Sequence, residues 1–301
     1  MAFLAPKSPP ADLPRLQPRG RDTSKRDYGR VVVVGGSAGM AGAPALAASA
    51  ALKSGAGLVE ALVPDAVVAI SAGFDPCVMT RGLPSAPDGT LAAGAGPLVH
   101  ERLAAADAFA IGPGLGRSAA VTALVHEWWR VVPRPAVFDA DALFALAQAP
   151  AAALADHAAP RILTPHAGEL LRLLGHDPAS PRAGDRPWLE ARAAELARAL
   201  DAVVVLKGPA TLVVDRGKSA HNDTGNPGMA TAGTGDVLTG IIAALLAQGL
   251  SAFAAARLAT WVHGRAGDLA AHDIGEIAMT ARDLLDRLSR GWRDATAAPA
   301  G

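Results

Sequence analysis

The most informative part of this chain reads Asn226-Pro-Gly-Met-Ala-Thr-Ala-Gly-Thr-Gly-Asp236 and runs directly into the apolar segment 237–246. Apolar residues in that segment recur at helical spacing, which predicts a helix that opens on a glycine-rich turn. The first N–H groups of a helix have no intrahelical partner, and the helix dipole favours negative charge beside them. Glycine also lets the backbone approach a ligand closely. The turn therefore predicts a site for an anion such as phosphate.

Asp236 lies at the same helix start, beside the predicted anion. A carboxylate does not bind phosphate, so its role must differ: it acts as a general base toward a hydroxyl, or it partners a metal ion. The ordinary alternative is that Asp236 only caps the helix. The Asn-Pro-Gly-Met-Ala run before the turn favours the functional interpretation.

The composition is that of one large globular protein with a sizeable core. The chain has 301 residues, is 50% hydrophobic and has a formal net charge of +0. This balance does not favour a nucleic-acid partner, and no apolar run reads as a membrane span. The single cysteine, Cys77, excludes an internal disulfide and is compatible with a cytoplasmic location. We expect Cys77 to be a buried small side chain.

Three regions are expected along the chain. Residues 1–27 are rich in proline and arginine, lack the apolar core of a signal peptide, and are predicted to be an extended or disordered leader. Residues 28–291 show no linker-like break and are predicted to form a single domain. Residues 292–301 are small and polar and are predicted to form a flexible tail.

In the central region, strand patterns alternate with helix patterns. The predicted strands are 31–34, 58–63, 107–111, 136–138, 161–163 and 203–206, with a hairpin at 211–214 and 217–222. The predicted helices are 43–52, 120–131, 168–174, 188–200, 236–248, 252–271 and 280–290. Strand, glycine loop and helix in repetition indicate an α/β domain with a mostly parallel sheet.

Every chemically suggestive cluster follows a predicted strand, and ligands of such sheets bind beyond the carboxyl ends of the strands. The clusters are 35–43, 112–116, 139–141, 164–169 and 207–211, and we expect them to share one site. The glycine loops 35–43 and 112–116 would admit a ligand close to the backbone, unless they are plain turns. Their spacing is not Gly-x-Gly-x-x-Gly, and no acidic residue ends the strand after the first loop, which disfavours a Rossmann cofactor site.

Two aspartates, Asp139 and Asp141, follow one of the predicted strands. At this spacing they would face the same side of a strand. They could then share a cation or bind sugar hydroxyls. Equally, Asp141 could cap the helix that starts near Ala142.

The remaining clusters offer further polar groups. His166 could hydrogen-bond a ligand, although a lone histidine is usually structural, and Glu169 could orient Mg²⁺ through water. The run 207–211 supplies a lysine and a threonine, which suits nucleotide phosphates, although a lysine at a turn is ordinarily a surface residue.

At these residues the chain resembles the ADP/ATP-dependent NAD(P)H-hydrate dehydratases of the ribokinase-like superfamily. The matching segments are GGSAGMAGA (35–43), GPGLG (112–116), DADAL (139–143), TPHAGE (164–169), LKGPAT (206–211) and NPGMATAGTGDVLTG (226–240). True kinases of the superfamily typically carry asparagine at the position of His166, which favours the dehydratase branch. The resemblance implies a three-layer α/β/α fold around a mostly parallel central sheet.

The resemblance also implies a reaction. The substrate would be the hydrated nicotinamide cofactor, (6S)-NADHX or NADPHX. ADP or ATP, with Mg²⁺, would phosphorylate the added hydroxyl, and loss of phosphate would restore NADH or NADPH. Bacterial members typically use ADP. The family is often tetrameric, which implies a homo-oligomer. Many relatives carry an N-terminal epimerase domain for which the leader is too short, which implies a separate epimerase as functional partner.

The family's motifs assign roles residue by residue. Contacts to the hydrated cofactor fall to Ala43, Gly114, His166 and Asp236. Contacts to the nucleotide fall to Lys207, Gly208, Pro209, Ala210, Thr211 and Gly235. The transferring phosphate would be held by Gly233, Thr234 and Gly235, and Asp236 would be the base toward the hydroxyl.

Three rival hypotheses remain at this point. A small-molecule kinase of the same superfamily, for a vitamin or a sugar, would stop at a stable phosphate ester. A nucleotide-binding regulator would keep the fold without activity, but the intact Asp236 argues against it. A Rossmann dehydrogenase is disfavoured by the loop spacing.

Overall fold

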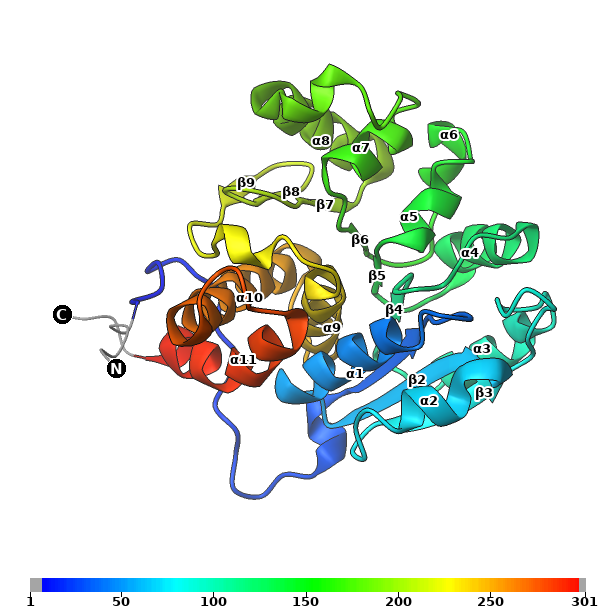
Figure 1. Ribbon diagram of the computed structural model, residues 1–301, viewed down its shortest axis with the longest axis horizontal. Helices are drawn as coiled ribbons and strands as arrows, with labels where there is room; N and C mark the ends of the chain where they lie inside the picture. Colours follow the sequence, from blue (N-terminus) through cyan, green and yellow to red (C-terminus); the bar gives the residue numbers. More distant parts are fainter. Residues whose placement is uncertain (1–6, 298–301) are drawn as a thin grey trace.

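The computed structural model describes residues 7–297 and is built around a nine-stranded sheet in the order β3-β2-β1-β4-β5-β6-β7-β8-β9 (Figure 1). The strands are β1 (Arg30–Val34), β2 (Leu58–Pro64), β3 (Met79–Leu83), β4 (Ala108–Ile111), β5 (Ala136–Phe138), β6 (Arg161–Leu163), β7 (Val203–Leu206), β8 (Leu212–Val214) and β9 (Ser219–His221). Strands β1 to β7 pair in parallel, and β8 and β9 add an antiparallel edge. The carboxyl ends of the parallel strands therefore lie along one edge of the sheet.

Helices cover both faces of this sheet (Figure 1). One face is covered by α1 (Gly42–Lys53), α9 (Thr234–Ala247), α10 (Ala252–Ile274) and α11 (Ala281–Thr296), with the short α2 (Val68–Ala72) beside β2 and β3. The other face carries α3 (Ala95–Leu103), α4 (Ala119–Val131), α5 (Asp141–Leu146), α6 (Ala151–Leu154), α7 (Ala167–Leu173) and α8 (Arg186–Leu200). Three-residue and four-residue 3₁₀ turns lie at Lys25–Tyr28, Asp65–Val67, Pro181–Gly184 and Pro227–Met229. The predicted three-layer α/β/α architecture is confirmed.

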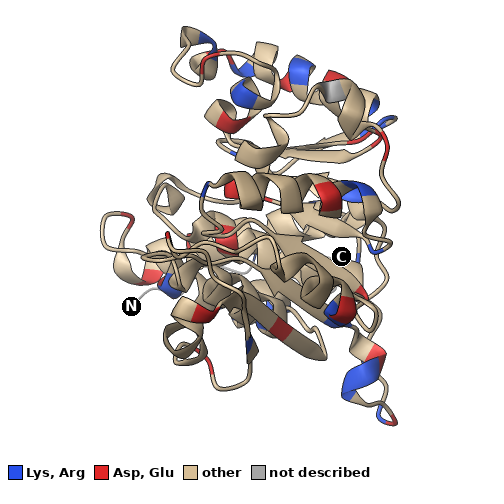
Figure 2. Cartoon of the chain, turned by 90° about the vertical axis from the view of Figure 1, so that its right-hand side faces the viewer, with Lys and Arg blue, Asp and Glu red and all other residues tan. Residues whose placement is uncertain are grey.

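The core alternates along each strand because successive side chains point to opposite faces. In β1, Val31 and Val33 belong to the apolar cluster under α1 and α9, whereas Val32 and Val34 belong to the cluster under α4. A strand buried on both faces needs apolar residues at every position, which explains the unbroken valine run. Charged residues concentrate on the outer helices and loops, and the strands are largely without them (Figure 2).

Helices α1 and α9 cross in backbone contact. A Cβ atom added to Gly240 on α9 would lie 1.9 Å from the carbonyl oxygen of Ala47 on α1, so only glycine fits there. The alanine-rich sequence of α1 keeps its buried face small, with Ala47, Ala48, Ala50 and Ala51 all buried. The small residues of α1 and Gly240 of α9 thus set a short distance between two helices that both begin at the carboxyl edge of the sheet.

Three parts of the sequence prediction need correction. The strand β3 and the helices α2, α3 and α6 were not predicted; β3 is an edge strand with alternating exposed positions and Gly82 inside it, so it lacks an apolar run. The last helix does not end near Arg290 but runs to Thr296, because Ala295 is buried. This part of the tail is therefore helical, while residues 298–301 lie outside the described residues. Cys77 is exposed rather than buried, because it lies on the turn before β3.

The segment before β1 packs against the domain. Residues 7–24 contain no helix or strand, as the prolines predict. Leu13 is nevertheless buried in the core, and Asp12 accepts a hydrogen bond from Arg257 of α10 at 2.6 Å. Within the described part of the chain, none of the helices combines the length and the hydrophobicity that a membrane crossing requires.

Candidate active site

The five predicted clusters follow β1, β4, β5, β6 and β7, and all lie along the carboxyl edge of the sheet. The two glycine loops contact each other there. Ser37 Oγ donates to the carbonyl oxygen of Gly114 at 2.9 Å, and Gly36 N donates to that of Pro113 at 2.9 Å. Gly114 has a φ of +60°, and a Cβ atom on it would lie 3.1 Å from the Cβ of Ala43. The structure thus brings Ala43 and Gly114, both predicted to contact substrate, side by side.

The start of α9 faces this edge with unpaired backbone donors. Gly233 is the N-cap, with a φ of 91° and no side-chain hydrogen bond to the helix start. The N–H groups of Thr234, Gly235 and Asp236 find no acceptor within residues 7–297. Thr234 Oγ1 closes the preceding turn by donating to the carbonyl oxygens of Met229 and Thr231 at 2.9 and 3.0 Å. This is the arrangement expected of an anion-binding helix terminus.

Asp139 forms a buried hub beneath that turn. Its Oδ1 accepts hydrogen bonds from Lys207 Nζ at 2.8 Å and from Thr164 Oγ1 at 2.7 Å, and its Oδ2 accepts one from Thr239 Oγ1 at 2.8 Å. Burial alone would raise the pKa of Asp139, but the charge of Lys207 and the three hydrogen bonds outweigh it and hold the pKa below its usual range. Asp139 is therefore an anion with protein partners on both oxygens.

Lys207 lies between two carboxylates and next to the anion turn. Its Nζ is 2.8 Å from Asp139 Oδ1 and 3.5 Å from Glu169 Oε2. Burial would lower its pKa, but the charges of Asp139 and Glu169 raise it above the ordinary lysine value. A Cβ atom added to Gly235 would lie 3.5 Å from Lys207 Nζ, so the ammonium borders the free N–H groups of α9. A cation and a set of backbone donors thus converge on one point.

Asp236 is the one carboxylate of the site without a hydrogen-bond partner among the described residues. Burial raises its pKa, the negative charge of Asp139 raises it further, and Lys207 offsets part of this, which leaves a pKa of about 8. A carboxyl group with this pKa can accept a proton near neutral pH, as a general base must. The alternative that Asp236 only caps α9 is not borne out, because no side-chain cap is formed there.

His166 and Glu169 cap the helix α7. Nδ1 of His166 accepts hydrogen bonds from the backbone N–H groups of Gly168 and Glu169 at 3.0 and 3.4 Å, and Glu169 Oε2 accepts one from His166 N at 2.8 Å. The other nitrogen, Nε2, lies 3.6 Å from Glu169 Oε2, and the His166 side chain is 59% exposed. His166 is therefore a structural cap of α7, and its contact with a ligand stays a prediction.

Asp141 turns away from Asp139. Its Oδ2 accepts from Gly116 N at 3.0 Å, and its Oδ1 accepts from Arg117 Nε at 2.9 Å. Ala140, between the two aspartates, has a φ of 48° and redirects the chain. The two carboxylates bind different partners, so the expected shared cation site is not formed. Asp141 does not cap α5 either, since no side chain bonds the start of that helix.

The predicted nucleotide loop follows β7. Gly208, Pro209 and Ala210 are exposed, and Thr211 Oγ1 donates to the carbonyl oxygen of Gly208 at 3.0 Å. Arg186, at the start of α8, donates to the carbonyl oxygen of Ala210 at 2.9 Å and to those of Leu206 and Lys207 at 3.3 Å. The loop is thereby held open toward solvent beside Lys207.

Several site residues carried no signal in the sequence. Thr164 and Thr239 bind Asp139 from other elements, and Arg186 holds the nucleotide loop. His263 of α10 contacts the carbonyl oxygen of Thr234 through Nε2 at 2.8 Å. Among the described residues, no group of three or more histidine, cysteine, aspartate or glutamate side chains is arranged to hold a metal ion.

A sequence model of the family described as NAD(P)H-hydrate dehydratase matches residues 31–290. The chain belongs to this family. The bifunctional NAD(P)H-hydrate repair enzyme Nnr of Moorella thermoacetica is 51% identical over 279 residues, which cover 92% of this chain and 51% of that protein. The ADP-dependent (S)-NAD(P)H-hydrate dehydratase of Neisseria meningitidis is 39% identical over 288 residues, with 90% of each chain covered. The chain thus spans about half the length of the bifunctional relatives it matches.

Solved structures agree with the family assignment. The ADP/ATP-dependent NAD(P)H-hydrate dehydratase of Bacillus subtilis, co-crystallised with ATP and Mg²⁺, superposes with a TM-score of 0.74 at 29% identity, covering 93% of this chain and 94% of that one. Ribokinase of Arabidopsis thaliana superposes with a TM-score of 0.54 at 15% identity, which shows a common fold alone. The resemblance and the ribokinase-like fold predicted from the sequence are both confirmed.

Proposed function

We propose that this chain dehydrates (6S)-NADHX and NADPHX to NADH and NADPH, with ADP or ATP as the phosphoryl donor. The observation that carries the proposal is the start of α9, where the unpartnered carboxylate of Asp236 lies directly beside free backbone N–H groups. A base next to an anion hole suits the transfer of a phosphoryl group to a hydroxyl. Family membership supplies the identity of that hydroxyl.

The residues have the following roles in the proposed reaction. Asp236 takes the proton of the hydroxyl that hydration has added to the nicotinamide ring, and the oxygen attacks the terminal phosphorus of the nucleotide. Lys207 and the N–H groups of the turn 233–235 neutralise the charge on the transferring phosphoryl group. In the second step, the C–O bond of the phosphate ester breaks and phosphate leaves with the bonding electrons. The adjacent ring carbon loses a proton to water, which forms the C=C bond of NADH.

The loops around this centre suit the two ligands. Ala43 and Gly114, which lie side by side in the paired glycine loops, would contact the hydrated cofactor together with His166. The exposed run 208–211 and Gly235 flank Lys207 and would hold the nucleotide. In this arrangement the hydroxyl and the phosphate meet at Asp236.

Mg²⁺ fits the site only together with the nucleotide. Lys207 and the two threonines already bind both oxygens of Asp139, and Glu169 pairs with Lys207 and accepts from His166 N. The protein alone therefore does not supply a complete set of ligands for Mg²⁺. Mg²⁺ commonly keeps several waters and binds through one or two carboxylates plus substrate phosphates. Glu169 would then reach the ion through water. Such an ion supplies neutralisation of phosphate charge.

The test is recovery of absorbance at the reduced nicotinamide band after hydrated NADH or NADPH is mixed with Mg²⁺ and either ADP or ATP. We expect nucleotide-dependent NADH formation with one phosphate released per turnover, and no turnover once a chelator removes Mg²⁺. The matched control is Asp236→Asn, which should bind nucleotide without turnover. Full recovery without nucleotide, or in the presence of the chelator, would contradict the proposal.

A small-molecule kinase of the same superfamily is the second candidate, since the fold of this chain is shared with ribokinase. The product decides between the two: a kinase accumulates a stable phosphate ester, whereas the dehydratase accumulates NADH and free phosphate. His166, where true kinases typically carry asparagine, favours the dehydratase. Phosphorus NMR of the reaction mixture distinguishes the two products directly.

The protein's partners are proposed on two observations. Relatives of which this chain spans about half are named bifunctional repair enzymes, which supports a second repair activity acting alongside it. We propose that this second activity is that of an NAD(P)H-hydrate epimerase and that both act in the cytoplasm. Exposed apolar side chains lie near and on the edge strand β3, at Ile70, Phe74 and Met79, which supports a homo-oligomer, with a tetramer as the expected form. Light scattering of the purified chain tests the second point.

A further inference from the structure

The loop that carries the anion site lies directly on the helix α10. A Cβ atom added to Gly264 would lie 2.3 Å from Thr224 Oγ1, and one added to Gly267 would lie 2.3 Å from Met229 Sδ. Real Cβ atoms do not approach other atoms this closely, so only glycine at these two positions leaves space for the loop on the surface of α10. The run 224–229 is thereby held at contact distance from one helix face.

Hydrogen bonds of side chains also fix the loop on this surface of α10. Thr224 Oγ1 donates to the carbonyl oxygen of Trp261 at 2.9 Å. About two turns further along α10, Asp268 accepts from Gly225 N at 3.1 Å and from Asn226 Nδ2 at 3.2 Å. These bonds hold the beginning of the loop against α10.

His263 holds the catalytic end of the loop. Its Nε2 is 2.8 Å from the carbonyl oxygen of Thr234, the first residue of α9. A carbonyl can only accept, so Nε2 carries the proton and the imidazole donates. Burial lowers the pKa of His263 to about 4, although the hydrogen bond to Thr234 opposes this, and the ring is therefore neutral at physiological pH.

The carbonyl of Thr234 and the N–H of Gly235 belong to one peptide plane and point in opposite directions. A bond that fixes the direction of the oxygen therefore fixes the direction of the N–H. Gly235 has no side chain to hold this plane by packing, and its N–H has no acceptor among residues 7–297. The hydrogen bond from His263 also polarises the peptide and strengthens the N–H as a donor.

We propose that His263 is a positioning residue of the anion hole: through the Thr234 carbonyl it aims the Gly235 N–H at the transferring phosphoryl group. This inference rests on the proposed function. It assigns His263 no contact with substrate, and it predicts that its loss affects the transition state more than ground-state binding, because a pre-aimed donor acts on the position that the phosphoryl oxygens take up during transfer.

Two variants distinguish a role of His263 in orienting the Gly235 N–H from the mere presence of a polar side chain at this position. His263→Gln places an amide N–H at about the reach of Nε2, whereas His263→Asn keeps the polarity but is one methylene too short. We expect His263→Asn to lower kcat by about 10–100-fold, less than the ~10²–10³-fold cost of losing an entire oxyanion donor. KM for the hydrated cofactor should stay nearly constant, and His263→Gln should restore most of kcat. Equal kcat for the Asn variant and wild type, or an equal loss in both variants, would overturn the inference.

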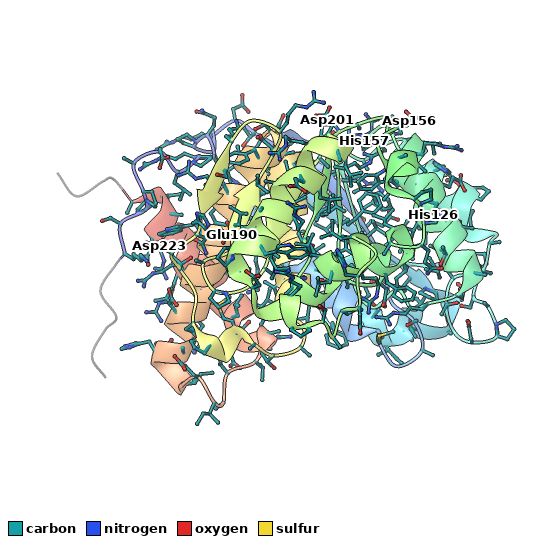
Figure 3. All side chains as sticks on the ribbon, turned by 90° about the horizontal axis from the view of Figure 1, so that it is seen from above. His126, Asp156, His157, Glu190, Asp201 and Asp223 are labelled. Carbon is teal, nitrogen blue, oxygen red and sulfur yellow. The ribbon has the colours of Figure 1, made fainter. Side chains whose placement is uncertain are left out.

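His157 offers a matched control. Its Nε2 makes the same 2.8 Å contact with a backbone carbonyl, that of Leu200, but it lies near Asp201 at the opposite edge of the sheet (Figure 3). His157→Asn removes the same type of hydrogen bond, so it should lower the melting temperature while leaving kcat unchanged. If His157→Asn lowers kcat as much as His263→Asn, the effect is one of stability and the positioning role is wrong.

A second measurement stands apart from turnover. Inorganic phosphate is titrated into ¹⁵N-labelled protein while the amide signal of Gly235 is followed. Wild type and His263→Gln should show a saturable downfield shift of the Gly235 proton, and His263→Asn a smaller one. An identical shift in all three variants would overturn the inference, even if wild type dehydrates hydrated NADH. Conversely, absence of that dehydration would remove the proposed function while the titration still decides the role of His263.

Discussion

Lys207 and Asp139 form a buried ion pair between residues that are 68 positions apart, with Nζ 2.8 Å from Oδ1. The pair joins the ends of β5 and β7 across the intervening strand β6, whose Thr164 donates to the same carboxylate oxygen. Because Asp139 uses both oxygens inside the protein, its effect on the reaction is indirect. It places the Lys207 ammonium beside Gly235 and, by its charge, helps to raise the pKa of Asp236.

Replacing Asp139 by Asn should destabilise the protein strongly. Lys207 would lose its closest counter-charge while it stays largely buried, and breaking one partner of a buried pair typically costs ~3–5 kcal/mol. Urea unfolding of Asp139→Asn measures this. Asp141→Asn is the control, since its partner Arg117 is 55% exposed and such pairs contribute about 0–1 kcal/mol. Equal losses in both variants would contradict the hub role of Asp139.

Replacing Asp236 by Asn should remove turnover and leave the fold intact. Loss of a positioned base typically costs about 10²–10⁴-fold in rate. With a pKa of about 8, Asp236 is mostly protonated at pH 7, so a neutral amide of the same shape should preserve stability. Steady-state kinetics and thermal melting of one preparation test both parts. Near-normal turnover would remove Asp236 from the mechanism.

The pH dependence of the reaction should report the same carboxyl group. A general base must be deprotonated, so kcat/KM should rise with pH, by about tenfold per unit on the acid side, and level off near pH 8. The residual activity of Asp236→Asn should lack this limb. A plateau that already begins below pH 6 would show that Asp236 is not the titrating base.

Stability should change with pH in the opposite direction. Between its ordinary value of 3.8 and about 8, Asp236 binds more proton in the folded than in the unfolded state, so the free energy of unfolding falls as pH rises. The pKa of His263 is lowered from 6.5 to about 4, so below pH 6.5 this residue has the opposite effect and the free energy of unfolding rises as pH rises. The Asp236 effect should therefore stand alone between pH 6.5 and 8, and Asp236→Asn should flatten the stability curve there in urea unfolding.

His166→Asn should keep the fold and alter substrate binding mildly. Asn is a good N-cap and can replace Nδ1 at the start of α7, whereas His166→Ala should cost ~1 kcal/mol. What Asn cannot replace is the exposed Nε2, so KM for the hydrated cofactor should rise with little change in kcat. An Asn variant that fails to fold would assign His166 a purely structural role.

The sequence predicted those parts of the site that are contiguous in the chain. The turn 226–236 contains both the backbone donors for the anion and the base Asp236 in one continuous segment, so its chemistry can be predicted from the local sequence. The Asp139 hub could not be read this way, because Thr164 and Thr239 lie 25 and 100 positions away and ordinary buried threonines have the same local sequence. His263 carries no motif, and its role depends on how α10 packs beneath α9. The edge strand β3 was missed for a related reason: exposed on one side, it needs no apolar run.

The contact between Gly240 and Ala47 bears on how the protein can move. Helix α1 follows the first glycine loop, and α9 follows the anion turn, so their crossing point ties two ligand-binding loops to one rigid joint. With backbone against backbone, neither helix can slide or rotate without a clash. The starts of α1 and α9 are therefore held in a fixed position relative to each other. We expect adjustments on ligand binding in the run 208–211 and at the exposed loop tip around Met40, which lie outside this helix crossing.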